Sequence, residues 1–271
     1  MPATLKILLT LLVLIVPVFL NAQVEFEHVP NRSATADFKF DRLPSPRKDD
    51  AATNAKLTLV DGTPDGGSAE LNALTDGQVP AHADEPGANF YFDSGTMGGR
   101  IRMDFPAPLD IKQINSYSWH PGSRGPQLYK LYAADGSEAN LNLAPKRGID
   151  PVSCGWRFIA TVSTIPKQGE EGGQYAASVT DASGNLGKVR YLLFDCYVTE
   201  LNDDYGNTFY SEIDVIGLSL NRSNKSYGSS TELSNDFTNQ SARLFTSYAV
   251  IASSCCSVNP ISSSPSVKQY F

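Results

Sequence analysis

The sequence predicts an all-β protein: an antiparallel β-sandwich or jelly roll with disordered tails. Two observations indicate this class. About eight short segments alternate apolar with polar side chains, and turns rich in Gly, Pro, Asn and Asp separate them. No amphipathic helical pattern with proper caps lies between these segments, which argues against a parallel sheet with crossover helices.

The central part of the chain carries the clearest strand pattern. Ile101, Met103 and Phe105 alternate with charged residues, as in a strand with one face in a core and the other in water. Pro106 and Pro108 are expected to end this strand, because proline donates no hydrogen bond to a ladder. The three strands expected in this part span residues 101–105, 111–119 and 128–133.

The remaining strands lie on both sides of the central part and of a polar insertion at residues 137–153. In one of them, alternation places Trp156, Phe158, Ala160 and Val162 on a single apolar face, and we interpret Trp156 as a core residue. The expected strands are 56–60, 156–162, 175–179, 191–198 and 209–220, besides two short extended pieces at 38–41 and 89–92.

Composition divides the chain into four parts. Residues 1–22 read as a secretory signal peptide, because Lys6 precedes a long apolar run and Ala22 offers a small residue before a cut at Gln23. A retained membrane anchor is the alternative, although Pro17 interrupts a run that is short for a bilayer. The other parts are a lead-in segment at 23–55, the sandwich domain at 56–220, and a Ser- and Asn-rich tail at 221–271 that is expected to be disordered.

Charge and cysteine content narrow the function classes. The net charge is -7 and no Lys/Arg cluster occurs, so a nucleic-acid surface is not expected. In a secreted or cell-envelope protein Cys154 and Cys196 could form a disulfide, or Cys196 could be a free buried thiol. The adjacent Cys255 and Cys256 lack the spacing of a metal site.

Six motifs stand out along the chain, at residues 74–77, 99–105, 129–136, 155–157, 190–195 and 211–215. Their order resembles that of discoidin (coagulation factor type C) domains, and the resemblance covers the region of about 55–220. These domains are galactose-binding-like jelly rolls and include many carbohydrate-binding modules. The resemblance implies a non-catalytic domain that holds its ligand with loops at one end of the sandwich.

The same resemblance implies a structural calcium ion. It points to Asp76 and Glu212, with backbone carbonyls around residues 78–81 completing the shell, and calcium does take mixed carboxylate and carbonyl ligands. The alternative is that Asp76 only shapes its turn and Glu212 is a solvated strand residue. No other cofactor is expected.

Ligand-binding candidates gather around the loop after residue 119. A sugar offers paired hydroxyls and an apolar face, so its site needs an aromatic ring with fixed hydrogen-bonding groups, and Trp119, His120 and Arg124 form such a set. Alternatively, Trp119 faces the core and His120 braces the turn. The side chains that could close the same end are Asn89, Tyr91, Tyr205 and Asn207.

Catalysis has weaker support. Glu212 and Asp214 share a strand face, as the paired acids of jelly-roll glucanases do, but Ile216 and Gly217 stand where a second catalytic Glu is needed. No Gly-x-Ser-x-Gly elbow or metal-ligand spacing occurs.

The sequence therefore predicts an exported, non-catalytic domain that binds carbohydrate or a cell-surface glycan, with no membrane span after signal cleavage. A structural or protein-interaction domain without a sugar site is the alternative, and a glucanase-like hydrolase comes third.

Overall fold

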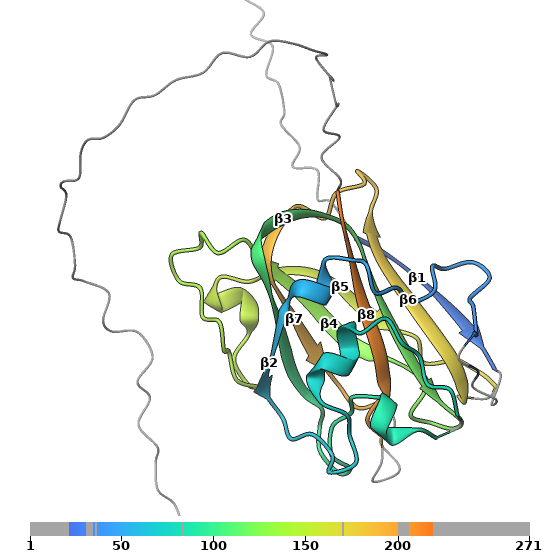
Figure 1. The fold of residues 1–271 in the computed structure, drawn as a ribbon. Coiled ribbons are helices and arrows are strands. Elements are labelled where there is room, and N and C mark those ends of the chain that lie inside the picture. Colours follow the sequence, from blue (N-terminus) through green and yellow to red (C-terminus); the bar gives the residue numbers. More distant parts are fainter. Residues whose placement is uncertain are drawn as a thin grey trace, which may run out of the picture. The chain divides into compact units, whose positions relative to one another are not determined.

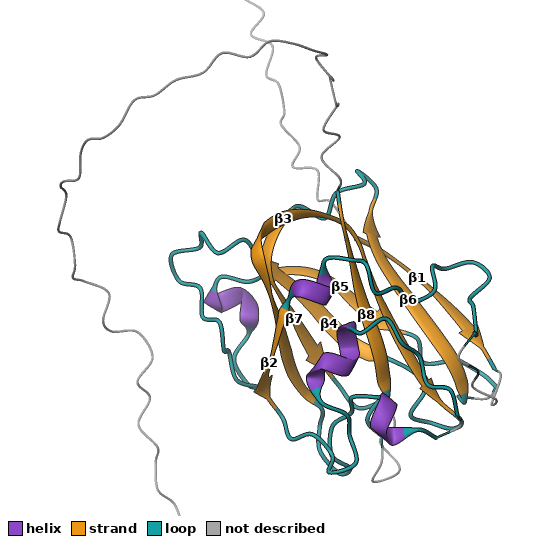
Figure 2. Ribbon diagram, in the orientation of Figure 1, coloured by secondary structure: helices purple, strands orange, loops and turns teal. Residues whose placement is uncertain are grey.

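The computed structural model describes residues 22–30, 35, 37–82, 84–169, 171–199 and 206–218. Residues 1–21 of the predicted signal sequence, Tyr205, and the whole predicted tail at 221–271 with its two cysteines at 255 and 256 lie outside them. The described residues confirm the predicted fold class, because they form antiparallel strands joined by loops and short 3-10 helices (Figures 1 and 2).

The described residues contain eight strands and four short helices. The strands are β1 (Ala22–Val29), β2 (Lys56–Asp61), β3 (Gly99–His120), β4 (Leu128–Ala134), β5 (Arg157–Ser163), β6 (Gly173–Asp181), β7 (Lys188–Cys196) and β8 (Tyr210–Gly217). The 3-10 helices are η1 (Ala52–Asn54), η2 (Leu71–Thr75), η3 (Pro86–Ala88) and η4 (Pro151–Cys154).

Two antiparallel layers share the long strand β3. Its first half pairs with β2 and β7, and the same layer continues through β4 to β5. Its second half pairs with β6 and β8, and β1 pairs with β6 at the edge of this second layer. In Figure 1 β3 bends across from one layer to the other.

The bend in β3 corrects the expectation that prolines end its first half. Gly99–His120 is one strand, and Pro106 and Pro108 lie within it. Its pairing with β7 is interrupted between Asp104 and Leu109, where β3 leaves one layer for the other. The prolines therefore occupy the gap in the ladder, where no N–H donor is needed.

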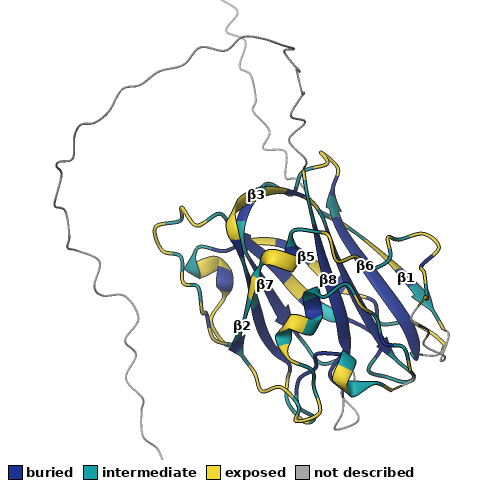
Figure 3. Ribbon diagram, viewed as in Figure 1, coloured by how far each residue is buried: buried dark blue, intermediate teal, exposed yellow. Residues whose placement is uncertain are grey.

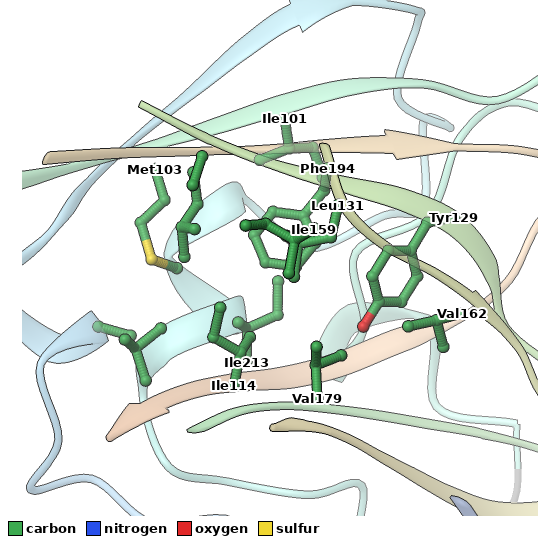
Figure 4. Close-up of a cluster of buried hydrophobic side chains, with 14 of the residues drawn as sticks. Ile101, Met103, Ile114, Tyr129, Leu131, Ile159, Val162, Val179, Phe194 and Ile213 are labelled. Carbon is green, nitrogen blue, oxygen red and sulfur yellow. The ribbon is translucent and has the colours of Figure 1, made fainter. Parts of the chain in front are cut away.

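The core lies between the layers. The side chains predicted to face it from the central segment, Ile101, Met103 and Phe105, are all buried and belong to one hydrophobic cluster. Figure 3 shows that the strands carry most of the buried residues, and in Figure 4 Ile101 and Met103 lie among side chains from both layers. A second cluster around Trp156 packs on the outer side of the first layer, where the indole Nε1 donates to the carbonyl oxygen of Asn142 at 2.8 Å. Trp156 is thus confirmed as a packing residue.

The expected lead-in segment contributes to the sheet. Ala22–Val29 forms β1 in register with β6, which was not predicted, whereas the expected strand at residues 38–41 does not form. Phe40 instead packs against Tyr117, on a cluster at the outer side of the second layer.

A buried carboxylate attaches this segment to β1. The two oxygens of Glu27 accept hydrogen bonds from the backbone N–H groups of Asp41, Arg42 and Leu43 at 2.8–2.9 Å. Burial by itself would raise the pKa of Glu27, but these donors outweigh it and hold the pKa below its usual 4.5.

We expect Glu27→Gln to lower the free energy of unfolding at neutral pH by about 1–2 kcal/mol, because a neutral amide cannot accept all three bonds. A lowered folded-state pKa means that the ionised group stabilises the fold above its unfolded-state pKa and loses this effect as pH falls through the folded value. The difference from wild type should therefore shrink below about pH 4.5 in urea titrations. Glu25→Gln, on the same strand but exposed, is the control, and equal effects of the two variants would contradict the prediction.

Candidate functional site

His120 is the last residue of β3, and Arg124 lies in the loop between β3 and β4, which backbone hydrogen bonds hold in place. The Gly125 N–H donates to the Gly122 carbonyl oxygen at 3.1 Å, which closes a tight turn. The Phe209 N–H donates to the Arg124 carbonyl oxygen at 2.9 Å, which ties the loop to the start of β8. Arg124 therefore starts from a fixed backbone position.

The Arg124 guanidinium lies on aromatic rings. Its Cζ atom is 4.1 Å from the centroid of the Phe209 ring and 4.8 Å from that of Tyr91. The two rings stack with centroids 4.0 Å apart, and Arg124 Nε donates to the Asn207 carbonyl oxygen at 3.3 Å. Cation–π contacts and this hydrogen bond hold the guanidinium plane in one orientation.

His120 stands beside the same aromatic pair, with its ring centroid 4.8 Å from that of Phe209. Its Nδ1 accepts the Gly122 N–H at 3.0 Å, so the neutral ring carries its proton on Nε2, 3.8 Å from a carboxylate oxygen of Asp84. Burial, aided by the charge of Arg124, lowers the pKa of His120. At neutral pH the imidazole therefore offers an N–H donor rather than a cation.

Tyr91 contributes its ring and a fixed hydroxyl. Burial, aided by a hydrogen bond with Asp65, raises the Tyr91 pKa to about 12, so the hydroxyl stays protonated. We refer to Tyr91, His120, Arg124 and Phe209 together as the Arg124 site. It combines a stacked aromatic pair with a guanidinium, an imidazole N–H and, at its edge, the largely exposed carboxylate of Asp84.

The structure brings some of the predicted residues together and separates others. His120 and Arg124 are partly exposed and lie over Tyr91 and Phe209, as a shared site requires. Trp119 is fully buried, which corrects the expectation that it presents a ring to solvent. It does not face the core between the layers either, because it lies on the same face of β3 as Tyr117, at the outer side of the second layer.

Asn89 and Asn207 close this end of the sandwich by holding loops. Asn89 Nδ2 donates to the Glu85 carbonyl oxygen, and its Oδ1 accepts from the Ser211 hydroxyl, both at 2.8 Å. Asn207 Nδ2 donates to the Asp93 carbonyl oxygen at 2.8 Å. Both side chains are buried, so neither offers its amide to solvent.

Sequence reasoning missed Phe209, Asp65 and Asp84. Phe209 was only the first residue of an expected strand, and nothing local indicates that its ring stacks on Tyr91. Asp84 has a positive φ of 50°, an uncommon backbone conformation for a residue with a side chain, which the sequence does not reveal.

The expected calcium ligands lie close to each other but differ in setting. Glu212 is fully buried, its Oε2 accepts the Gly77 N–H at 2.7 Å, and its Oε1 has no hydrogen-bond partner. Asp76 accepts from the N–H and side-chain amide of Gln78 at 2.9 and 3.2 Å, which is the turn-shaping role given as the alternative. For Glu212, however, the alternative of a solvated strand residue is wrong, because the side chain is fully buried.

A calcium ion fits this donor set. The buried Oε1 of Glu212 lacks a partner, and each Asp76 oxygen keeps a second lone pair. Burial, with the charges of Asp214 and Asp76 adding to it, raises the pKa of Glu212 to about 9, and a bound cation would reverse that effect. Among the described residues, no group of three or more His, Cys, Asp or Glu side chains could hold a metal, so backbone carbonyls would have to complete the shell.

No protein-family model matches the sequence, and no curated protein matches it. Among solved structures, the CBM32-2 module of GH31 bound to GalNAc aligns with a TM-score of 0.41 and 12% identity, over 60% of this chain and 97% of that chain. CBM32-1 from a family 31 glycoside hydrolase of Clostridium perfringens gives a TM-score of 0.39 and 12% identity, over 62% and 98%.

A fucolectin from striped bass (Morone saxatilis) serum gives a TM-score of 0.40 and 14% identity, over 62% of this chain and 48% of that chain. At 12–14% identity, these three alignments are likenesses of fold alone. Within the described residues, no helix has the length and apolar character needed to cross a membrane.

The carboxylate pair considered for glycoside hydrolysis is not open to a substrate in this structure. Glu212 and Asp214 are both fully buried, and Asp214 accepts a hydrogen bond from the Tyr117 hydroxyl at 3.1 Å. Burial, with the charge of Asp50, raises the pKa of Asp214 to about 7. Paired acids of a glycosidase must flank a bound sugar, and these two lie beneath their neighbours instead.

Of the two alternatives for Cys196, the disulfide with Cys154 does not form. Cys154 and Cys196 are both free thiols, and Cys196 is buried in the main core, as the alternative held. Burial raises the pKa of Cys196 to about 12, so it stays a neutral thiol that packs like a small apolar residue.

Proposed function

We propose that this chain is an exported, non-catalytic domain that binds carbohydrate at the Arg124 site. The observation that supports this most directly is the placement of Arg124, whose guanidinium is held by two aromatic rings and a backbone carbonyl next to a neutral imidazole. Fixed donors of this kind lose little conformational entropy when they bind the paired hydroxyls of a sugar. Export is supported by the apolar run at residues 7–20.

Affinity at this site would come mainly from hydrogen bonds. The rings of Tyr91 and Phe209 stack on each other and carry the guanidinium, so they serve chiefly to orient Arg124. The His120 Nε2–H and the Arg124 N–H groups supply donors, and Asp84 supplies an acceptor. A hydroxyl pair of a neutral or acidic sugar matches this combination of donors and an acceptor.

A glycan array followed by calorimetry tests the proposal. Arg124→Gln and His120→Ala should each weaken binding by about tenfold or more, since each removes a fixed donor. Arg190→Gln is the matched control, because Arg190 also lies over an aromatic ring, at 5.5 Å from the Tyr191 centroid, but far along β7. It should bind as wild type does.

Two outcomes would contradict the proposal. Unchanged binding by Arg124→Gln and His120→Ala, with both variants folded, would remove the Arg124 site. If the wild-type protein binds no glycan on the array, the alternative of a structural or protein-interaction domain is favoured.

We also propose that Glu212 and Asp76 bind calcium. In protein freed of metal with a chelator, added calcium should raise the melting temperature, because a ligand at about a hundred times its Kd adds roughly 2.7 kcal/mol to stability. Glu212→Gln should fold, since glutamine resembles the protonated carboxyl, but should lose the response to calcium. Asp49→Asn, an exposed carboxylate elsewhere, should keep it. If calcium does not shift the melting temperature of the wild-type protein, the proposed calcium site is contradicted.

A further inference from the structure

A hollow of about 540 Å³ lies at the end of the sandwich opposite to the Arg124 site. Strand β4 runs from Leu128, next to the Arg124 loop, to Ala134 at the other end, where β5 and β7 begin and β6 ends. The hollow opens among these strand ends. The side chains used below are Asp135, Arg157, Phe158, Asp181, Asn185 and Lys188, and we call this place the Phe158 hollow.

An exposed aromatic ring forms one wall. Strict alternation predicts that Phe158 faces the core, but the pairing of β4 with β5 shifts between Leu131 and Tyr132, so that Ile159 is an extra residue in the ladder. Ile159 enters the core and Phe158 turns outward, with 46% of its surface exposed. Its ring meets that of Tyr132 edge-on at 5.6 Å, which fixes its orientation.

An arginine stands beside this ring. Arg157 Nη2 donates to the Leu186 carbonyl oxygen at 2.8 Å. A Cβ atom at Gly187, which has a φ of 95°, would come within 3.3 Å of the same nitrogen, so this turn leaves room for the guanidinium. A guanidinium has five N–H donors, and this hydrogen bond uses one of them.

Acceptors are held in place around the arginine. Asp135 Oδ1 accepts the Ser137 N–H at 2.8 Å, and Asp181 Oδ1 accepts the Ser183 N–H at 2.7 Å. Asn185 Oδ1 likewise accepts the Gly187 N–H at 2.7 Å. Turns formed by these side chains therefore orient the polar groups before any ligand arrives.

The charges around the hollow indicate the class of ligand. Arg157 and Lys188 are opposed by Asp135 and Asp181, so a ligand with a net charge meets repulsion from one pair or the other. A neutral ring with hydroxyls on its edge and an apolar C–H face uses donors, acceptors and the Phe158 ring together. We propose that the Phe158 hollow binds a neutral sugar residue, as a second glycan site separate from the Arg124 site.

The choice of sugar as ligand rests on the proposed glycan-binding function, but the site itself does not depend on the Arg124 site. Two sites at opposite ends of the strands make the chain bivalent. One molecule then links two glycan chains, or binds one surface with an avidity that exceeds either affinity.

The test is an NMR titration of ¹⁵N-labelled full chain with methyl glycosides of neutral sugars and with N-acetylgalactosamine. Backbone signals of residues 185–188 should shift on addition of at least one probe, and Phe158→Ser should weaken this binding by tenfold or more. Phe26→Ser is the matched control, because Phe26 is 45% exposed on β1 and does not line the hollow. Arg157→Lys, which keeps the charge but not the fork of donors, should also weaken binding.

The variant Arg124→Gln separates the two sites. Shifts at residues 185–188 that persist in Arg124→Gln and vanish in Phe158→Ser support the second site. Shifts confined to the Arg124 site, and lost in Arg124→Gln, overturn the second site while leaving the proposed function standing. If no signals shift at either end, both the second site and the proposed glycan-binding function are contradicted. Equal effects of Phe158→Ser and Phe26→Ser would contradict the role of the hollow.

Discussion

Asp195→Ala is expected to destabilise the protein more than removal of any surface charge. Arg100 and Asp195 are 4% and 2% exposed, and they form a two-pronged ion pair, with Nε to Oδ1 at 3.0 Å and Nη2 to Oδ2 at 3.1 Å. Arg100 Nη1 also donates to the carbonyl oxygens of three residues in the polar insertion, Pro145, Lys146 and Ile149. The pair therefore joins β3, β7 and the insertion.

Truncating the carboxylate leaves a buried guanidinium without its counter-charge, which costs about 3–5 kcal/mol. Urea denaturation with circular dichroism measures this as a lower midpoint. Asp49→Ala breaks an exposed ion pair with Arg47 and should change the midpoint little, because solvent screens that pair. If the two variants unfold at the same urea concentration, the Arg100–Asp195 pair does not hold the insertion as the geometry indicates.

Trp119→Ala is expected to have the second large effect. The indole is 0% exposed, so its removal leaves a cavity and should lower the free energy of unfolding by about 3–5 kcal/mol. Trp119→Phe keeps an aromatic ring in the same place and should lose less. Thermal melting of the three proteins measures the series.

The same residue separates packing from ligand binding. Trp119→Phe, if folded, should bind every glycan that wild type binds, whereas His120→Ala should weaken binding at the Arg124 site by about tenfold or more. A fully stable Trp119→Ala would contradict the packing role of the indole. Loss of glycan binding in Trp119→Phe without loss of stability would show that the indole acts at the ligand.

Strand pattern predicted much of the fold because it is local. The inward positions of Ile101, Met103 and Phe105 follow from alternation along one strand, and the structure buries all three. The same rule bears on the binding loop. Trp119 and His120 are consecutive residues of β3, so their side chains point to opposite faces, and only one of them can join Arg124.

Pairing between strands determined features of the fold that alternation within a single strand cannot predict. The shift between Leu131 and Tyr132 turns Phe158 outward and Ile159 inward, and no residue near 158 signals it, because the shift is a property of two strands together. The continuation of β3 through Pro106 and Pro108 likewise depends on a neighbouring strand. Proline is excluded only where a ladder needs its N–H, and that depends on the position of β7.

The amino-acid sequence by itself determined the all-β class, most strand positions and the loop that carries His120 and Arg124, because these depend on turn residues and on alternation within single strands. Only the tertiary structure decided that Arg124 lies on Phe209 and Tyr91, that Glu212 is buried, and that Phe158 faces a hollow at the other end. Each of these results from contacts between segments far apart in the chain, whose energies act only once the two layers have closed on their core.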